Sequence, residues 1–436
     1  MPTALSKLSV ASLALGLPLA QSFGVGPAPS RPVVRPRCGH AHAIADLVKP
    51  LVGASSSSKQ NLGNAVPDCP STIWDVEGLD VEEWQQKYRS EDLPACPIEV
   101  VATPEDNAAG RAYFLENRER FAEMLATHGT IWFRGFDLMK DTEGFREFWE
   151  ALELAPCLDP IHSSGLRKFL SKSDAVYEEV NKQSLSRHYI GLHQEMTEKK
   201  TATAGAFVCF QPATVSGGEF FIADGERIFR DMDADVLKLL IDRQVRISVS
   251  NLDLGVLGVL PGSTKEQAME AVRAKVAETV APKFDMDLDM IWGTDGNDMR
   301  LQAIEHAQSP INRHPKSGRP VWFCNMHNHA RFLRERRYCS VPEVGMTDVF
   351  YGDLDIIEGE VLSKVNEACE KNIVKVPMQK GDVLLCDNYR VLHGRDVFEG
   401  DRLHAVSWFG TGGEIAQQSG TTNAIRDFIN EVIVGE

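Results

Sequence analysis

The chain has 436 residues, of which 43% are hydrophobic and 25% charged, and its net charge is −16. This length fits one large globular domain or two ordinary ones. The negative charge disfavours nucleic acid and anionic membrane surfaces as partners, because proteins that bind them need a basic surface. A small molecule is the expected partner, since a local arginine or metal ion can attract an acidic ligand into an acidic protein. The nine cysteines form no CxxC pair, so free thiols are expected.

The N-terminal segment has the features of a targeting sequence. Residues 1–45 contain no Asp or Glu, and an apolar run at 8–20 ends in small residues of the kind found at signal-peptidase sites. We therefore expect residues 1–22 to be a signal segment, and residues 23–70 to be a transit-like segment and linker. This pair resembles the two-part plastid presequence of diatoms and related algae, with Phe23 after the cleavage point. Entry into the endomembrane system or secretion is the alternative.

From residue 71 to residue 436 the sequence indicates one domain, with no repeat or low-complexity break. Periodicity and composition predict its elements. In chain order these are a helix at 108–128, a strand at 129–136, a helix at 142–153, a strand at 203–212, a turn and strand at 216–224, helices at 234–243 and 263–278, a strand at 319–326, a helix at 358–372, and two closing strands at 382–394 and 403–410. Because strands dominate the second half, we expect an α+β fold in which helices flank a jelly-roll sandwich.

One triplet has the spacing of metal ligands. Residues i and i+2 of a strand point to the same side, so His193 and Glu195 could bind a single ion. His393, on a distant predicted strand, could provide the third ligand. Two imidazoles and one carboxylate leave open positions on iron(II), where an oxoacid and dioxygen can bind. The triplet alone is weak, because such triplets arise by chance in a chain of this composition.

The context of the triplet is more specific. The segments "THGTIWFRGF", "LHQEMT", "FVCFQPATVSGGEFFIADGERIF", "NRHPKSGRPVWFCN", "VFYGDLDII" and "KGDVLLCDNYRVLHGRDVFEGDR" occur in this order between residues 129 and 408. They resemble successive blocks of the TauD/TfdA family of 2-oxoglutarate dioxygenases, and most closely its secondary-metabolism members. The resemblance implies a double-stranded β-helix (cupin-like) core and a requirement for Fe(II), 2-oxoglutarate and O2, with ascorbate as a reductant in vitro. It also implies oxidation of an unactivated C–H bond, with release of succinate and CO2.

Carried over to this sequence, the resemblance makes His193, Glu195 and His393 the iron ligands. Arg402, nine residues after His393, takes the place of the arginine that binds the distal carboxylate of 2-oxoglutarate. A guanidinium makes a bidentate pair with a carboxylate, which a lysine cannot reproduce. Arg395 is the competitor for this role, because it lies closer to His393 in the sequence.

The sequence departs from the family at one position. The family usually has "GGET", whose Thr often supports the same carboxylate, whereas this chain has Phe220 in that place. Thr214 or Ser216 could substitute for the missing hydroxyl. Phe220, Trp322 and Asn325 are also candidate lining residues of the substrate pocket, because they lie in blocks that border the pocket in the family.

Two further patterns have alternative interpretations. His327 and His329 have a spacing suitable for zinc, but no further ligand pattern completes a site, so a packing or substrate-facing role is favoured. Asp382 and Asp387 are expected to cap turns around the strand that carries His393.

Hydroxylation is the default reaction. Desaturation and oxidative ring closure, as in algal kainoid biosynthesis, are variants, and an inactive jelly-roll binding protein is the alternative from another class.

Overall fold

The computed structural model describes residues 66–161, 169–171, 176–178, 181, 185–253, 266–267, 269–271, 273–274, 287–293, 300–335 and 347–410. The predicted targeting segments lie outside these residues, except for the last part of the predicted linker. That part is folded, because Cys69 is buried and the carbonyls of Pro67 and Pro70 accept hydrogen bonds from the amides of Leu158 and Thr201. The linker therefore ends before residue 70, which corrects the predicted boundary.

Several helices begin where a side chain can satisfy one of the first free amides. Asp80, Asp141 and Asp233 each accept a hydrogen bond from an amide in the first turn of the helix that follows. The described helices are α3 (Val81–Ser90), α4 (Pro104–Ala109), α5 (Arg111–Glu116), α6 (Arg118–His128), η2 (Leu138–Lys140), α7 (Thr142–Ala151), α8 (Gly225–Asp231), α9 (Ala234–Arg243), α11 (Met326–His329), α12 (Arg331–Glu335) and α13 (Gly359–Lys371). Within the described residues, no helix is long and apolar enough to cross a bilayer.

The helix predicted at 108–128 is in fact divided between α4, α5 and α6. Gly110 has a φ of 55°, a conformation that glycine adopts readily, and it ends α4. Asn117 separates α5 from α6 and donates its side-chain amide to the carbonyl of Tyr113. The helices predicted at 142–153, 234–243 and 358–372 correspond to α7, α9 and α13. The helix predicted at 263–278 is described only in part, and its described residues are helical.

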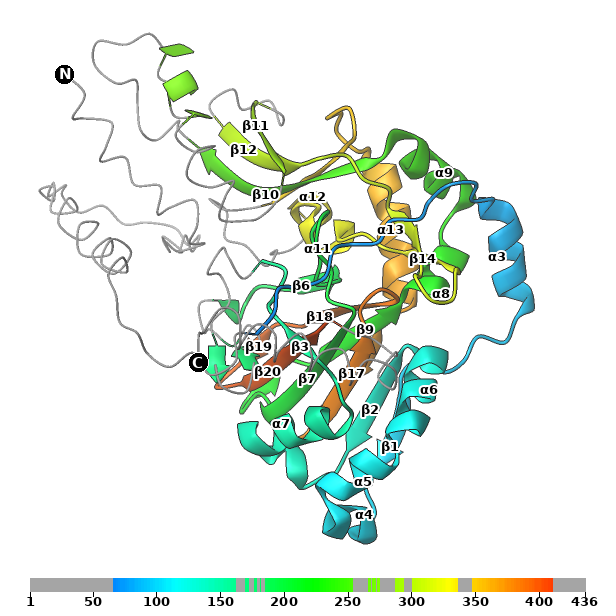
Figure 1. The fold of residues 1–436 in the computed structure, drawn as a ribbon. Coiled ribbons are helices and arrows are strands. Elements are labelled where there is room, and N and C mark those ends of the chain that lie inside the picture. Colours follow the sequence, from blue (N-terminus) through cyan, green and yellow to red (C-terminus); the bar gives the residue numbers. More distant parts are fainter. Residues whose placement is uncertain are drawn as a thin grey trace, which may run out of the picture.

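Two sheets form the centre of the molecule (Figure 1). The larger sheet has the strand order β1-β2-β17-β7-β20-β5-β4, with β3 paired to β20, and the smaller has the order β16-β9-β18-β6. Their strands are β1 (Ile98–Val101), β2 (Thr130–Arg134), β3 (Pro156–Cys157), β4 (Phe169–Ser171), β5 (Val176–Glu178), β6 (Ile190–His193), β7 (Ala204–Gln211), β9 (Phe220–Asp224), β16 (Val374–Val376), β17 (Val383–Asp387), β18 (Val391–Arg395) and β20 (Leu403–Phe409).

Further strands extend the molecule beyond the two central sheets. In Figure 1, β10 (Val245–Asp253), β11 (Leu288–Trp292) and β12 (Arg300–Glu305) project from the upper part of the molecule. These three strands form a sheet with β15 (Val349–Tyr351). The remaining pairs are β13 (Ile311–Arg313) with β14 (Pro320–Trp322), and β8 (Ser216–Gly217) with β19 (Phe398–Glu399).

Alternation along the strands divides the core into layers. In β7, Phe207 belongs to the apolar cluster between the two sheets, whereas its neighbours Ala206 and Val208 belong to the cluster beneath the N-terminal helices. In β9, Ile222 faces the inner cluster and Phe221 faces a third cluster, which includes residues of α8, α9 and α13. Both sheets are therefore covered on both faces. This architecture is the predicted α+β jelly roll flanked by helices.

The strand predicted at 382–394 is really two strands in different sheets. β17 belongs to the larger sheet and β18 to the smaller one, and a turn joins them. Asp387 stabilises this turn as predicted, because its carboxylate accepts a hydrogen bond from the amide of Tyr389 at 3.1 Å. The turn moves the chain from one sheet to the other. Similarly, the strand predicted at 319–326 ends at Trp322, and the chain then enters α11.

Candidate metal centre

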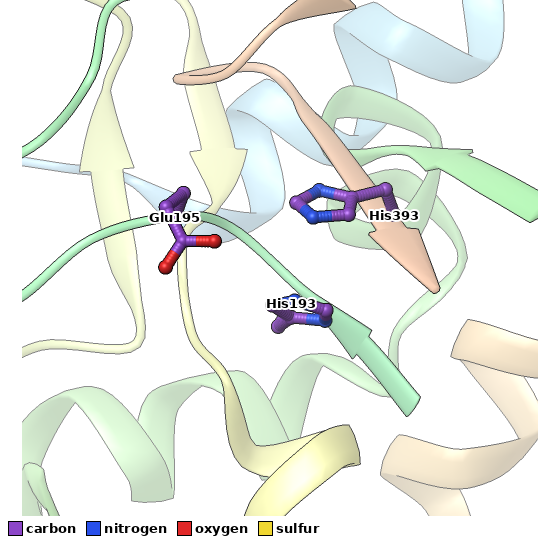
Figure 2. Close-up of side chains that lie close together, drawn as sticks. All are labelled: His193, Glu195 and His393. Carbon is purple, nitrogen blue, oxygen red and sulfur yellow. The ribbon is translucent and has the colours of Figure 1, made fainter. Parts of the chain in front are cut away.

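The structure brings together the three residues that the sequence singled out as metal ligands. His193 ends β6, and His393 lies directly opposite it on the neighbouring strand β18. The possible ligand atoms of His193, Glu195 and His393 all lie within 4.8 Å of one another. Figure 2 shows the three side chains pointing toward one another. All three residues are at least 92% buried, so a metal bound here would be shielded from bulk water.

Glu195 lies beyond the end of β6, so strand alternation does not explain its position. Two asparagine side chains hold this segment instead. Asn325 accepts a hydrogen bond from the amide of Gln194 at 2.8 Å and donates one to its carbonyl at 3.1 Å. Asn388 makes the equivalent pair with the backbone of Glu195, both at 3.0 Å. Asn325 was a predicted pocket residue, but its side-chain amide makes hydrogen bonds with the backbone of Gln194, next to Glu195.

The outer edge of β6 is covered by α11. The amide of Gly191 donates to the side chain of Asn328 at 3.0 Å, and the amide of Leu192 donates to Nδ1 of His327 at 2.9 Å. A Cβ atom at residue 191 would lie 2.4 Å from the carbonyl oxygen of His327, which explains the glycine there. His327 therefore has the packing role that the sequence analysis favoured.

A hydrogen bond from the ring of His193 to the backbone sets the orientation of this side chain. Nδ1 lies 2.9 Å from the carbonyl oxygen of Gly191. Because a carbonyl can only accept, Nδ1 carries the hydrogen and Nε2 is left with a lone pair for a metal. His329 is a neighbour of His193 and contacts the hydroxyl of Thr347 at 2.9 Å. Burial is the main cause that lowers the pKa of His329 to about 3, so its ring is neutral.

Aromatic rings surround His393 on the inner face of the sheets. The centroids of Phe207, Phe220 and Trp408 lie 4.6, 5.9 and 5.9 Å from that of His393, and Phe220 is parallel to it within 4°. Phe220 thus borders the centre, and its predicted contact with the substrate stays a prediction. Trp322 does not border the centre, because it is fully buried in the cluster on the outer face of the smaller sheet. The prediction for Trp322 is corrected to a core role.

The two candidate arginines have different surroundings. The guanidinium of Arg395 donates to three backbone carbonyls, those of Leu185, His188 and Asp396, at 2.9 to 3.2 Å. Arg402 donates to the carbonyl of Gly218 at 3.3 Å and to the side chain of Asn181 at 3.1 Å. Both arginines are buried. All three contacts of Arg395 are with backbone carbonyls around β18, whereas one contact of Arg402 is with a side chain.

Comparisons with known proteins agree with this geometry. The sequence pattern of the family described as "Taurine catabolism dioxygenase TauD, TfdA family" matches residues 98–408. The chain belongs to the TauD/TfdA family. It is therefore a dioxygenase, and the enzyme class expected from the sequence is confirmed.

Individual relatives of this TauD/TfdA protein are distant. The dapdiamide synthesis protein DdaC of Enterobacter agglomerans is 25% identical over 304 residues, which cover 65% of this chain and 83% of the relative. A clavaminate synthase-like protein of Arabidopsis thaliana is 28% identical over 118 residues, which cover 27% of this chain and 33% of the relative. Among solved structures, PvcB of Pseudomonas aeruginosa is 14% identical with a TM-score of 0.42, covering 72% of this chain and 86% of that one.

The departure from the TauD/TfdA pattern at Phe220 has a clear structural consequence. Neither predicted substitute for the missing Thr lies in the interior. Thr214 is exposed and accepts a hydrogen bond from the amide of Asp401 at 2.9 Å. Ser216 is exposed and contacts the carboxylate of Glu399 at 3.4 Å. Neither hydroxyl is therefore in a position to support a buried carboxylate.

Proposed function

We propose that this dioxygenase binds iron(II) through His193, Glu195 and His393, binds 2-oxoglutarate through Arg402, and oxidises a C–H bond of a small molecule. The observation that supports this most is the convergence of two imidazoles and one carboxylate in a buried interior. Iron(II) prefers this donor set when part of its coordination sphere must stay open. Zinc sites of structural type would instead be closed by a fourth protein ligand.

The protein residues have defined tasks in this proposal. The bond from His193 to the carbonyl of Gly191 fixes the ring that faces the metal. Asn325 and Asn388 hold the backbone on both sides of the carboxylate ligand. Phe207 and its aromatic neighbours keep water away from the bound groups. Iron(II) and 2-oxoglutarate, when bound, would supply the oxidising power for attack on the C–H bond.

The substrate is proposed only by class. DdaC is named for the synthesis of dapdiamide. This supports a biosynthetic small molecule as substrate, in agreement with the resemblance to secondary-metabolism members. Hydroxylation is the simplest outcome. Ring closure of an amino-acid derivative, as in algal kainoid biosynthesis, is the variant that the presequence favours.

The proposed activity can be tested without knowing the substrate. Purified protein with iron(II), ascorbate and 2-oxoglutarate should release succinate, even if only by uncoupled turnover, and Glu195→Ala should release none because it lacks the carboxylate ligand. Glu143→Ala, at an exposed helix position, is the matched control and should retain wild-type release. No metal-dependent succinate from the wild type would favour the alternative, a jelly-roll protein that only binds its ligand.

We also propose that residues 1–45 direct the chain to a plastid or into the endomembrane system. The proposal rests on the absence of acidic residues and on the apolar run behind a basic start. A fluorescent protein fused behind residues 1–45 should enter one of these compartments, which imaging would reveal. A reporter that stays in the cytosol would contradict it.

A further inference from the structure

We propose that His404 is a specificity residue of the co-substrate site, which donates a hydrogen bond to the distal carboxylate of 2-oxoglutarate beside Arg402. The inference rests on the proposed function, and it deepens it by naming the second group that recognises the carboxylate. Four observations on β20 and its neighbours support it.

The first observation is the direction of the side chain. In the register between β20 and β7, His404 is opposite Cys209, and Val406 is opposite Phe207. Residues directly opposite each other in an antiparallel pair point to the same side. Cys209 and Phe207 belong to the cluster between the two sheets, so His404 also points into the interior.

The second observation is the position of His404 along the interior. Phe207, at the level of Val406, contacts the ring of His393 at a centroid distance of 4.6 Å. His404 lies two residues further along the strand, which is about 7 Å. The separation of the two carboxylates of a linear five-carbon diacid is of this order, so a diacid bound to the metal through one end can reach His404 with the other.

The third observation is a shared partner that fixes His404 relative to Arg402. The side-chain oxygen of Asn181 accepts hydrogen bonds from the guanidinium of Arg402 at 3.1 Å and from the amide of His404 at 3.0 Å. The side-chain nitrogen of Asn181 donates to the carbonyl of His404 at 2.8 Å. The imidazole and the guanidinium are therefore held as one unit.

The fourth observation is an unsatisfied ring nitrogen. His404 is 97% buried, and its Nδ1 has no hydrogen-bond partner among the residues that the structure describes. Such a group is costly unless a ligand satisfies it. Burial, with the charges of Arg402 and Arg395, lowers the pKa of His404 well below its ordinary value. The ring is thus neutral and keeps one N–H donor, while the two guanidiniums favour an anion as its acceptor.

The acidic side chains of the adjoining loop do not provide this acceptor. Asp396 pairs with Lys375 at 2.9 Å, Glu399 contacts Ser216 at 3.4 Å, and Asp401 is exposed. With Phe220 in place of a hydroxyl residue on β9, the histidine on β20 is the interior donor best placed to share the carboxylate with Arg402. A co-substrate without a distal carboxylate would gain nothing from His404.

The experiment compares two ligands that differ only in that carboxylate. The full chain loaded with Mn(II) is titrated with 2-oxoglutarate and with 2-oxopentanoate by calorimetry. His404→Leu should weaken 2-oxoglutarate about tenfold or more, because a hydrogen bond to a charged group is lost. Its affinity for 2-oxopentanoate should stay within about threefold of the wild type. His404→Asn, whose amide nitrogen lies near the position of Nδ1, should keep most of the affinity for 2-oxoglutarate.

Two further variants complete the design. His128→Leu, at a partly exposed histidine on α6, is the matched control and should change neither affinity. His404→Phe provides a second apolar side chain of ring size if the leucine variant does not fold, and Mn(II) binding reports on folding in each case. Unchanged 2-oxoglutarate affinity in the apolar variant, or an equal loss for both acids, would overturn the role of His404. Failure of the wild type to bind either acid would overturn the proposed function as well.

Discussion

Two asparagine side chains and a histidine hold the segment that carries the proposed metal ligands His193 and Glu195, although none of the three is a proposed ligand. Asn325 and Asn388 bond to the backbone of Gln194 and Glu195, and His327 accepts a hydrogen bond from β6. The proposed ligand residues could be singled out from the sequence because the triplet and His393 lie in blocks of family-like order. The supporting residues could not, because their partners lie about 130 to 190 positions away and only the fold brings them together.

The arginines give a prediction at this scale. Arg402→Ala should raise the dissociation constant for 2-oxoglutarate roughly 30-fold or more, since a buried carboxylate would lose its charged partner. Arg402→Lys should recover little, because a lysine cannot make the bidentate pair. Calorimetric titration of the Mn(II)-loaded protein measures both effects.

Arg395→Ala is expected to affect stability rather than 2-oxoglutarate binding. The guanidinium of Arg395 donates to three backbone carbonyls, so its loss should lower the free energy of unfolding by about 1 to 3 kcal/mol. Its effect on 2-oxoglutarate affinity should be small. A large loss of affinity in Arg395→Ala, with affinity retained in Arg402→Ala, would reverse the assignment of the two arginines.

At the scale of elements, most predicted helices and strands agree with the structure because their periodicity matches their burial. The helix at 234–243 and the strand at 203–212 are examples, with α9 and β7 close to the predicted bounds. The predicted strand at 382–394 failed because apolar residues lie on both sides of a short polar turn at 388–390, and this pattern predicts one strand. Periodicity along the chain cannot reveal that β17 and β18 belong to different sheets.

The strand β12 gives a prediction about pH. Glu305 is 95% buried on this strand, and burial, followed by the charge of Glu198, raises its pKa to about 8. In the unfolded chain this carboxyl ionises near about pH 4.3. Between that pH and about 8, the folded state therefore binds more protons than the unfolded state. Stability from this residue should therefore fall as the pH rises through that window.

Glu305→Gln tests this directly. The amide keeps the size of the side chain and remains uncharged, so the variant should gain stability over the wild type by on the order of 3 kcal/mol at pH 8. The gain should be much smaller at pH 5. Urea unfolding at both values measures it, and a difference between the two proteins that does not depend on pH would contradict the assignment.

At the scale of the whole molecule, three apolar layers hold the two sheets and their helices together. The inner layer contains the rings around His393, whereas the two outer layers contain no proposed ligand. The fold class was predictable from the order of helices and strands along the chain. The burial of Cys69 was not, because it depends on strands distant in the sequence.

The central claim is that one metal ion is held by His193, Glu195 and His393, and metal binding tests it most directly. Protein stripped of metal and titrated anaerobically with iron(II) should bind one ion per chain. His193→Ala and His393→Ala should each abolish this binding, because two remaining ligands hold a divalent ion poorly. His128→Ala, at a partly exposed histidine on α6, should bind like the wild type. Undiminished iron binding in both ligand variants would contradict the account.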